Sequence, residues 1–199
     1  LDILINANTY NKSNISFVVG STIKEKYLPK VLNLLDDPRE EIRERVIYAL
    51  SYTRSTLPVS KLLNLLEKDS SILIRKESAY SLGRIGFEGS IPKLKESMTD
   101  FSAEVRAAIV SALQQIASRE GVPILLSATQ DIDNRVRERA IEALSIAPND
   151  TEVIETLIKC LEDIDTHVQY TAALTLGKVK AVRAAPKIIT LLNQENSEV

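Results

Sequence analysis

The segment VRAAIVSAL, residues 105–113, decides the fold of this chain. Counted from its closing leucine, Leu113, the apolar residues fall eight, four, three and one positions earlier, and again three positions later at Ile116. This spacing follows one face of a helix with 3.6 residues per turn. The segment therefore predicts an amphipathic helix that buries its apolar face.

The same pattern recurs along the chain, and the closing leucine returns every 31 or 32 residues. An Asp stands five residues before each segment, and an Arg is the second residue of the first four segments. The leucines are Leu50, Leu82, Leu113, Leu144 and Leu176, the aspartates are Asp37, Asp69, Asp100, Asp131 and Asp163, and the arginines are Arg43, Arg75, Arg106 and Arg137. Gln169 replaces the arginine in the fifth segment. Five segments in one register indicate an internal repeat.

Each repeat is predicted to contain two helices, because a second apolar helical stretch lies ahead of each aspartate. Prolines mark the start of these first helices, where a missing N–H costs little. They are Pro29, Pro58, Pro92, Pro123 and Pro186. Asp37 and Pro38 predict a capped start of the second helix with the proline in its first turn. In later repeats Ser102, Asp133 and Asp165 compete with the preceding aspartate for the capping role.

The composition fits packed helices and narrows the functional classes. Of 199 residues 44% are apolar and 26% charged, with no Trp and six Gly. A net charge of -2 and a pI of about 5.6 disfavour broad binding to nucleic acid or anionic lipid. The single cysteine, Cys160, excludes an intrachain disulfide and favours a cytoplasmic setting. No apolar run reaches the roughly 18 to 20 residues of a membrane span, so we expect no membrane insertion.

These repeats resemble the HEAT repeats, in particular the short bacterial and archaeal kind known as phycobilisome-lyase HEAT-like repeats. The resemblance covers nearly the whole chain and is best matched at Asp69, Ile74-Arg75, Leu82-Gly83, Ile85-Gly86 and Ile91-Pro92. It implies an all-α fold, a right-handed α-solenoid (superhelix) of stacked antiparallel two-helix repeats. It also implies that the repeated Asp and Arg residues form a ladder between adjacent repeats, interrupted at Gln169, and that the second helices line the concave surface.

We expect a single HEAT-like solenoid over residues 1–199 that is a fragment of a longer protein with further domains. Its repeats are predicted at about 1–26, 27–56, 57–90, 91–120, 121–150 and 151–184, with a partial repeat at 185–199. Aligning Gly20 with Gly83 places a second helix at residues 11–22, whose inward face would be Ile15, Val18 and Val19. Near the other end, four apolar residues have no predicted cover. They are Ile188, Ile189, Leu191 and Leu192.

Candidate partner-binding residues are those that point outward from the second helices, five and two positions before the closing leucine and two after it. They include Arg45, Tyr48, Tyr52, Glu77, Tyr80, Arg84, Arg139, Glu142, Leu174 and Lys178, and the third repeat places Ala108 and Ser111 there. Tyr48 and Tyr80 occupy equivalent positions of adjacent repeats, so we expect them to stack side by side near Arg45 and Arg84. Tyr and Arg commonly anchor protein interfaces, which makes these residues candidates for binding a partner. The alternative is that these tyrosines only shield the groove.

No residue pattern indicates catalysis, a metal or a cofactor. His167 starts a second helix at a solvated position, and Cys160 follows the apolar register of a first helix with no assignable His beside it. We therefore expect a non-enzymatic interaction scaffold or regulatory domain that binds another protein on its concave face. A phycobilin lyase or isomerase subunit is the alternative that the resemblance suggests. A HEAT-like DNA-binding or DNA glycosylase domain is a second alternative, disfavoured because neither Trp nor a basic concave face is present.

Overall fold

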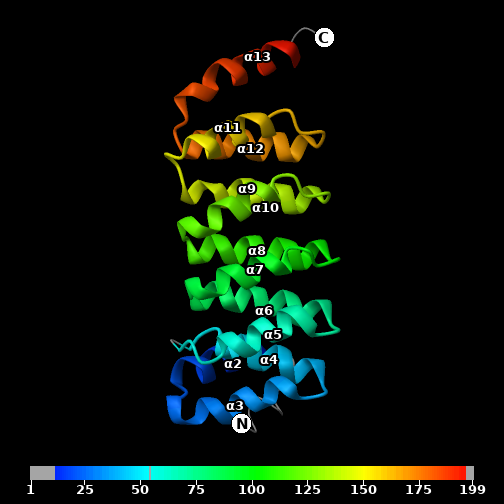
Figure 1. Ribbon diagram of the computed structural model, residues 1–199, viewed down its shortest axis with the longest axis vertical. Helices are drawn as coiled ribbons and strands as arrows, with labels where there is room; N and C mark the ends of the chain where they lie inside the picture. The colour runs from blue at the N-terminus through cyan, green and yellow to red at the C-terminus, as the bar shows by residue number, and fades with distance from the viewer. Residues whose placement is uncertain (1–11, 54, 196–199) are drawn as a thin grey trace. The chain divides into compact units, whose positions relative to one another are not determined.

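The computed structural model describes residues 12–53 and 55–195, and the side chains of 17–53 and 55–190 within them. Figure 1 shows that the described chain is built from helices, and no strand occurs in these ranges. The chain divides into two compact units, Leu1–Ile116 (unit 1) and Ala117–Val199 (unit 2). The predicted repeat start near residue 1 and the side chains of Ile15, Leu191 and Leu192 lie outside the described residues.

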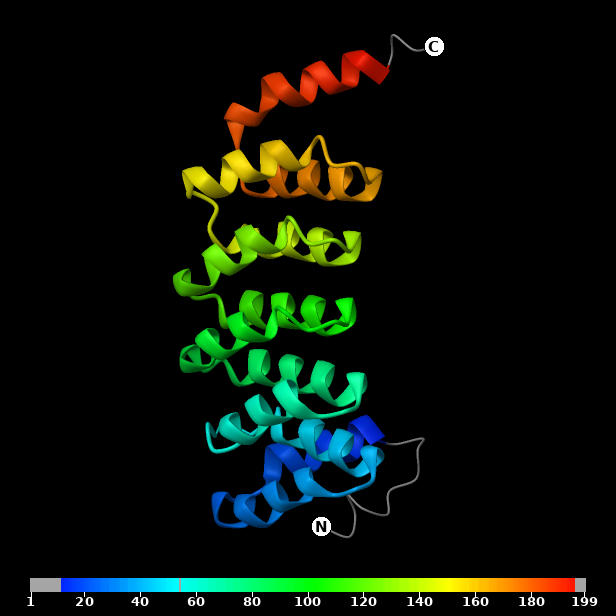
Figure 2. The same ribbon diagram turned by 45° about the vertical axis from the view of Figure 1, so that its right-hand side comes forward.

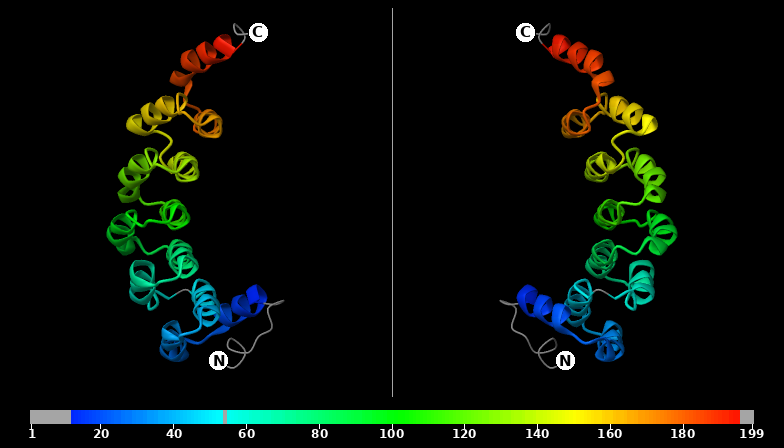
Figure 3. Two further views of the ribbon diagram at one scale, coloured as in Figure 1. Left: turned by 90° about the vertical axis from the view of Figure 1, so that its right-hand side faces the viewer. Right: turned by 90° about the vertical axis from the view of Figure 1, so that its left-hand side faces the viewer.

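Unit 1 is a stack of helix pairs in two layers (Figure 3). The layer of first helices contains α3 (Leu28–Leu32), α5 (Val59–Lys68) and α7 (Ile91–Ser97). The layer of second helices contains α2 (Lys12–Thr22), α4 (Glu40–Leu50), α6 (Ile72–Ile85) and α8 (Ala103–Ile116). Helix α6 packs against both α4 and α8, and α2 packs on α4, so each second helix contacts its neighbours in the stack.

Unit 2 repeats the arrangement. Its first helices are α9 (Val122–Ala128), α11 (Thr151–Cys160) and α13 (Ala185–Glu195), and its second helices are α10 (Asn134–Ala143) and α12 (Thr166–Lys178). Helix α10 packs against α12 and α9, and α11 packs on α12 (Figure 2). The all-α fold of stacked two-helix repeats predicted from the sequence is confirmed.

The closing leucines form the core, as predicted. Within their units, Leu50, Leu82, Leu113, Leu144 and Leu176 are each at most 1% exposed. The proline signal also holds, because the prolines of α3, α7 and α9 lie in the first turn and Pro58 is the N-cap of α5. The fixed φ of proline suits these positions, so the chain enters these four first helices without losing a needed N–H, whereas α11 begins without a proline.

The structure decides how the second helices begin. Three N-cap side chains accept backbone N–H groups of the first turn, those of Ser71, Asp133 and Asp165. The repeated aspartates instead shape the loop before the cap, since each carboxylate accepts the backbone N–H of the residue two positions later.

The predicted start of the first of these second helices, with Asp37 as cap and Pro38 in the first turn, is wrong. Helix α4 begins at Glu40, because the Asp37 carboxylate accepts the backbone N–H of Arg39 at 2.9 Å and leaves Pro38 in the loop.

Buried Arg–Asp pairs join successive repeats in unit 1. Arg43 donates to Asp69 from Nε at 3.0 Å and Nη2 at 3.1 Å, and Arg75 donates to Asp100 in the same way at 2.7 and 3.1 Å. The Nη1 of Arg75 also donates to the backbone oxygen of Asp69 at 3.0 Å. Each arginine therefore ties the loop of its own repeat to the aspartate of the next, which is the ladder that the resemblance implies.

The ladder continues in unit 2 and then changes at Gln169. Arg137 donates to both carboxylate oxygens of Asp163 at 2.8 Å. Burial opposes ionisation of Asp163, but the bonds from Arg137 and from a backbone N–H outweigh it, so the pKa of this carboxyl is lowered. Gln169 donates from Nε2 to the backbone oxygen of Asp163 at 2.6 Å. Gln169 keeps the hydrogen bond to the loop of its own repeat, but its neutral amide cannot form the ion pair that the arginines make with the aspartate of the next repeat.

The helix nearest the start of the described chain differs from the prediction. Val18 is 55% exposed and Val19 is half-buried, so the inward face expected for α2 is wrong at Val18. Helix α2 approaches α4 through Gly20, where an added Cβ would collide with the backbone oxygen of Ala49. This approach sets which face of α2 is covered. In unit 2, Ile189 of α13 is 57% exposed, as predicted.

Candidate partner-binding site

Three aromatic rings and one guanidinium meet on the second-helix layer of unit 1. Phe17 of α2 contacts Tyr52 edge-on, with ring centroids 4.9 Å apart, and Tyr52 contacts Tyr48 of α4 at 5.2 Å. The Cζ atom of Arg84, near the end of α6, lies 5.1 Å from the Tyr48 centroid and 5.2 Å from that of Tyr52. Both distances are in the range of cation–π attraction. We call Phe17, Tyr48, Tyr52 and Arg84 the aromatic–arginine cluster.

Hydrogen bonds fix the cluster. The Tyr52 hydroxyl donates to the Tyr48 hydroxyl at 2.9 Å, and Nη1 of Arg84 donates to Tyr52 Oη at 3.3 Å and to Ser51 Oγ at 3.2 Å. The bond to Tyr48, with burial second, raises the pKa of Tyr52. The phenol therefore stays neutral at physiological pH, and Arg84 supplies the positive charge of the cluster.

The structure corrects the predicted stack of Tyr48 and Tyr80. Among the described residues no ring contact joins these two tyrosines, and Tyr52 takes the place next to Tyr48. Tyr52 lies in the turn that follows the end of α4, four residues after Tyr48, and a spacing of four residues at helical pitch brings side chains about 5–6 Å apart. Equivalent positions on neighbouring helices are separated by the roughly 8–10 Å interaxial distance. Tyr80 and Glu77 are half-buried in the middle of α6, before Arg84, and burial raises the pKa of the Glu77 carboxyl. Arg45 is half-buried on α4.

Phe17 is the member of the cluster that the sequence analysis missed. It is 50% exposed and packs on Tyr52. The alignment of Gly20 with Gly83 places Phe17 in the slot of Tyr80, and that alignment is the signal that could have found it. The third repeat is a further correction, because Ala108 and Ser111 are buried. Their side chains are too short to reach past the neighbouring residues of the stack to solvent.

The predicted site residues of unit 2 lie on its own second helices. Arg139 and Glu142 of α10 form an ion pair of 3.4 Å with both side chains nearly half exposed. An exposed pair of this kind contributes about 0–1 kcal/mol. On α12, Leu174 is 46% exposed and Lys178 is exposed. Arg139 and Glu142 thus lie on α10 and Leu174 and Lys178 on α12, and none of these four residues is aromatic.

Unit 2 also contains a hollow of about 440 Å³ beside an irregular linker. In three other repeats the residue four positions after the closing leucine has a positive φ: 71° at Gly86, 54° at Ala117 and 55° at Lys180. Pro148 occupies this position after α10, and its ring holds φ near −65°. The linker therefore takes another path. It forms the 3-10 helix η6 (Leu144–Ile146) directly after α10, and no 3-10 turn adjoins the start of α11 at Thr151 as one does before α7, α9 and α13.

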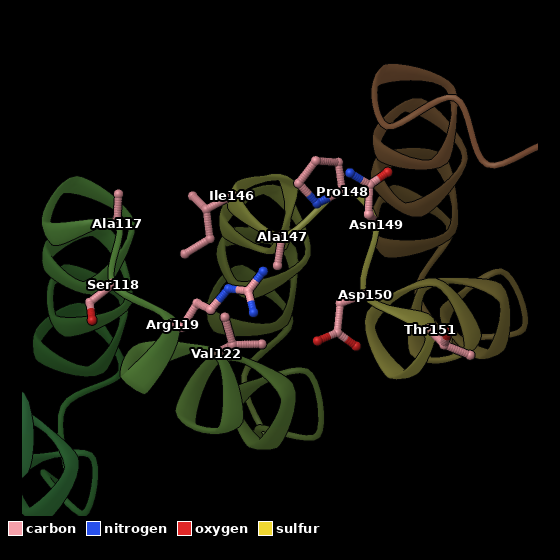
Figure 4. A pocket seen from close by; sticks show the side chains of 10 residues that line it. All are labelled: Ala117, Ser118, Arg119, Val122, Ile146, Ala147, Pro148, Asn149, Asp150 and Thr151. Atoms are coloured by element: carbon pink, nitrogen blue, oxygen red, sulfur yellow. The ribbon is translucent and has the colours of Figure 1, made fainter.

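Figure 4 shows the side chains around this hollow. The guanidinium of Arg119 extends between the two linkers, and the carboxylate of Asp150 faces the same space. Asp150 is the N-cap of α11 and accepts the backbone N–H groups of Glu152 and Val153 at 2.9 and 3.3 Å. Apolar side chains, including Val122 and Pro148, complete the walls. The acidic group of the hollow thus has a structural role as a cap.

The reactive side chains are placed as the sequence predicts. Cys160 is 5% exposed, and burial, followed by the charge of Asp163, raises its pKa to about 11. The His167 side chain is 83% exposed at the start of α12. In the described part of the chain no group of three or more His, Cys, Asp or Glu residues could hold a metal ion. None of the helices described there is long and apolar enough to cross a bilayer.

Comparison with known proteins identifies the family. The HEAT repeats family matches residues 28–113, 91–152 and 146–199. The chain is 24% identical over 149 residues to the bilin biosynthesis protein PecE of Nostoc sp. (strain PCC 7120), which is 75% of this chain and 59% of PecE. It thus spans less than two thirds of the length of that relative.

Two solved structures have the same fold. The structure of YibA from E. coli superposes with a TM-score of 0.73 and 20% identity, covering 97% of this chain and 72% of YibA. The complex of CpcE and CpcF of phycocyanin lyase from Nostoc sp. PCC7120 gives a TM-score of 0.60 and 18% identity, covering 93% of this chain and 77% of the matched one. At these identities the likeness concerns the fold alone. Because the family match extends over most of the sequence, we conclude that this chain belongs to the HEAT repeats family.

Proposed function

We propose that this chain is a protein-binding HEAT-repeat domain that holds a partner on the second-helix layer of unit 1. The observation that carries the proposal is the aromatic–arginine cluster, in which Arg84 is held over Tyr48 and Tyr52 and remains exposed. Tyr and Arg are the residue types that contribute most to binding energy at protein interfaces. A cluster that is already ordered before binding loses less side-chain entropy when the partner arrives.

A variant pair tests this proposal. Tyr48→Ala combined with Tyr52→Ala removes two rings of the cluster, and a partner captured from the native organism by affinity purification and mass spectrometry should bind this variant at least about tenfold more weakly. Tyr170→Ala is the matched control, because Tyr170 is a 65% exposed tyrosine on α12, outside the cluster. Both variants should keep the helical circular-dichroism signal. Unchanged binding by the double variant would remove the proposed site.

A second candidate is a subunit of a phycobilin lyase. The sequence similarity to PecE and the structural likeness to the CpcE–CpcF complex support this assignment at least as well as they support an unspecified scaffold. The two candidates are compatible in part, because a lyase subunit that works in a complex must also bind a partner protein. On this assignment the chain contributes to an enzyme, contrary to the expectation of a purely non-enzymatic scaffold.

Spectroscopy separates the two candidates. The full chain is mixed with a phycobilin, alone and with a phycobiliprotein subunit, and the visible absorbance is followed. A lyase subunit should change the position or intensity of the bilin band, since binding restricts the chromophore. If the spectrum is unaltered in both mixtures while the partner is still retained, the chain is a protein-binding domain without bilin chemistry.

A further inference from the structure

Among the residues that the structure describes, Arg84 forms no ion pair with a carboxylate. Arg39, Arg43 and Arg75 each form an ion pair with an aspartate. Arg84 is exposed, and its contacts with the described residues are the hydroxyls of Ser51 and Tyr52 and the two tyrosine rings. The side chain is therefore held in one place by neutral groups, and its guanidinium forms no direct ion pair with a described acid.

The held position of Arg84 leaves hydrogen-bond donors for a ligand. A guanidinium has five N–H groups, and the two bonds to Ser51 and Tyr52 both come from Nη1. In the described part of the chain, Nε and Nη2 donate to no protein acceptor. These two atoms form the planar fork that binds the two oxygens of a carboxylate, as they do in the pair of Arg75 and Asp100.

The surroundings of Arg84 combine this fork with apolar surface. Phe17 is half exposed at the other end of the cluster, and Phe17 and Tyr52 border a hollow of about 530 Å³ whose other walls include Ser21, Thr53 and Glu25. A side chain that covers Phe17 would also exclude water from the rings that face Arg84. Removing water lowers the local dielectric constant, so an ion pair formed there is stronger than one on an open surface.

We infer that the partner presents a carboxylate to Arg84 together with an adjacent aromatic or aliphatic side chain that packs on Phe17 and Tyr52. This inference rests on the proposed function and specifies the chemistry of the partner. Polyanions such as nucleic acid fit less well, because Glu44 and Glu77 lie near enough to influence each other's charge on the same helix layer, and Glu77 also senses Arg84. Arg84 is the one cation of the aromatic–arginine cluster, so the cluster suits a single carboxylate better than a row of phosphates.

Selection from a library of random peptides tests this chemistry without knowledge of the natural partner. The full chain is immobilised, bound peptides are enriched, and the best are synthesised with a fluorescent label. We expect enriched sequences to contain Asp or Glu within a few residues of Phe, Tyr, Leu or Ile. Replacing that acid by its amide should weaken binding at least about tenfold, the change expected from losing a charge-assisted bidentate bond of about 1.4 kcal/mol or more.

Variants of the chain complete the test. Arg84→Gln should bind the acidic peptide and its amide equally, and Arg84→Lys should keep part of the preference because it retains the charge and loses the fork. Arg183→Gln is the matched control, since Arg183 is an exposed arginine of unit 2 outside the candidate residues, and it should bind like the parent. Far-UV circular dichroism checks that each variant is folded.

The outcomes separate this inference from the proposed function. Enriched peptides without acidic residues, or acidic peptides that bind Arg84→Gln as tightly as the parent, overturn the inference. If such peptides still depend on Tyr48 and Tyr52, the protein-binding site itself stands. A selection that yields no peptide dependent on any residue of the cluster overturns both.

Discussion

Removing Arg75 should show how much the ladder contributes to the stack. Its side chain is 5% exposed, that of Asp100 is 9% exposed, and two hydrogen bonds of 2.7 and 3.1 Å join them. Truncation by Arg75→Ala leaves the Asp100 carboxylate buried with only the Ser102 N–H as a bonding partner among the contacts described above. Breaking a buried pair from one side destabilises by about 3–5 kcal/mol, and we expect a loss in this range.

Gln169 provides the matched comparison. Its amide keeps the bond to the carbonyl six residues earlier, so Arg75→Gln should retain the contact with the backbone oxygen of Asp69 and cost about 1 kcal/mol less than Arg75→Ala. Adding Asp100→Asn removes the unpaired charge and keeps an acceptor for the backbone N–H. The double variant should therefore be more stable than Arg75→Gln alone, by about 1–3 kcal/mol.

Urea unfolding followed by far-UV circular dichroism measures these differences. Repeats contact only their neighbours, so the transition can separate into parts, and hydrogen exchange of α6 and α8 should be recorded as well. The loss should be concentrated in these helices of unit 1. A cost below about 1 kcal/mol for Arg75→Ala, or a double variant less stable than Arg75→Gln, would refute the assignment of the ladder as a paired buried charge.

Three further predictions concern glycine, acid and thiol chemistry. Gly83→Ala should lower the thermal midpoint because the new methyl would lie 2.7 Å from the Cα of Ala112, whereas Gly177→Ala, at the same register with open space around it, should raise stability by up to about 1 kcal/mol. The pKa of the Asp37 carboxyl is lowered from 3.8 to about 2, chiefly by the hydrogen bond from the Arg39 side chain. The ionised carboxylate therefore stabilises the folded chain above pH 3.8, and this contribution is lost as the pH falls toward 2. Asp37→Asn should flatten this part of an acid unfolding curve, and an unaltered curve would contradict the linkage. Cys160 should react slowly with a thiol reagent at neutral pH because its pKa is raised to about 11, and quickly once urea unfolds the chain; rapid reaction of the native chain would show that the thiol is accessible.

The sequence by itself determined the repeat, the helix pairs and the core. The period is a one-dimensional property, and a residue that returns every 31 or 32 positions on the apolar face of a helix must be buried when equal units stack. The five closing leucines and the prolines of the first helices followed from this rule. The Arg–Asp ladder followed from the family resemblance, since both partners recur in fixed register.

Only the tertiary structure decided which side chains meet on the surface. Tyr52 contacts Tyr48 in place of Tyr80, and Phe17 joins them because α2 packs closely on α4 through Gly20. Periodicity predicts that a side chain points outward, but it does not predict the distance from that side chain to the next helix. A change of a few ångströms in this distance decides whether two rings are in contact. The hollow beside Pro148 has the same origin, because one residue that cannot adopt a positive φ changes the path of its linker while leaving the repeat intact.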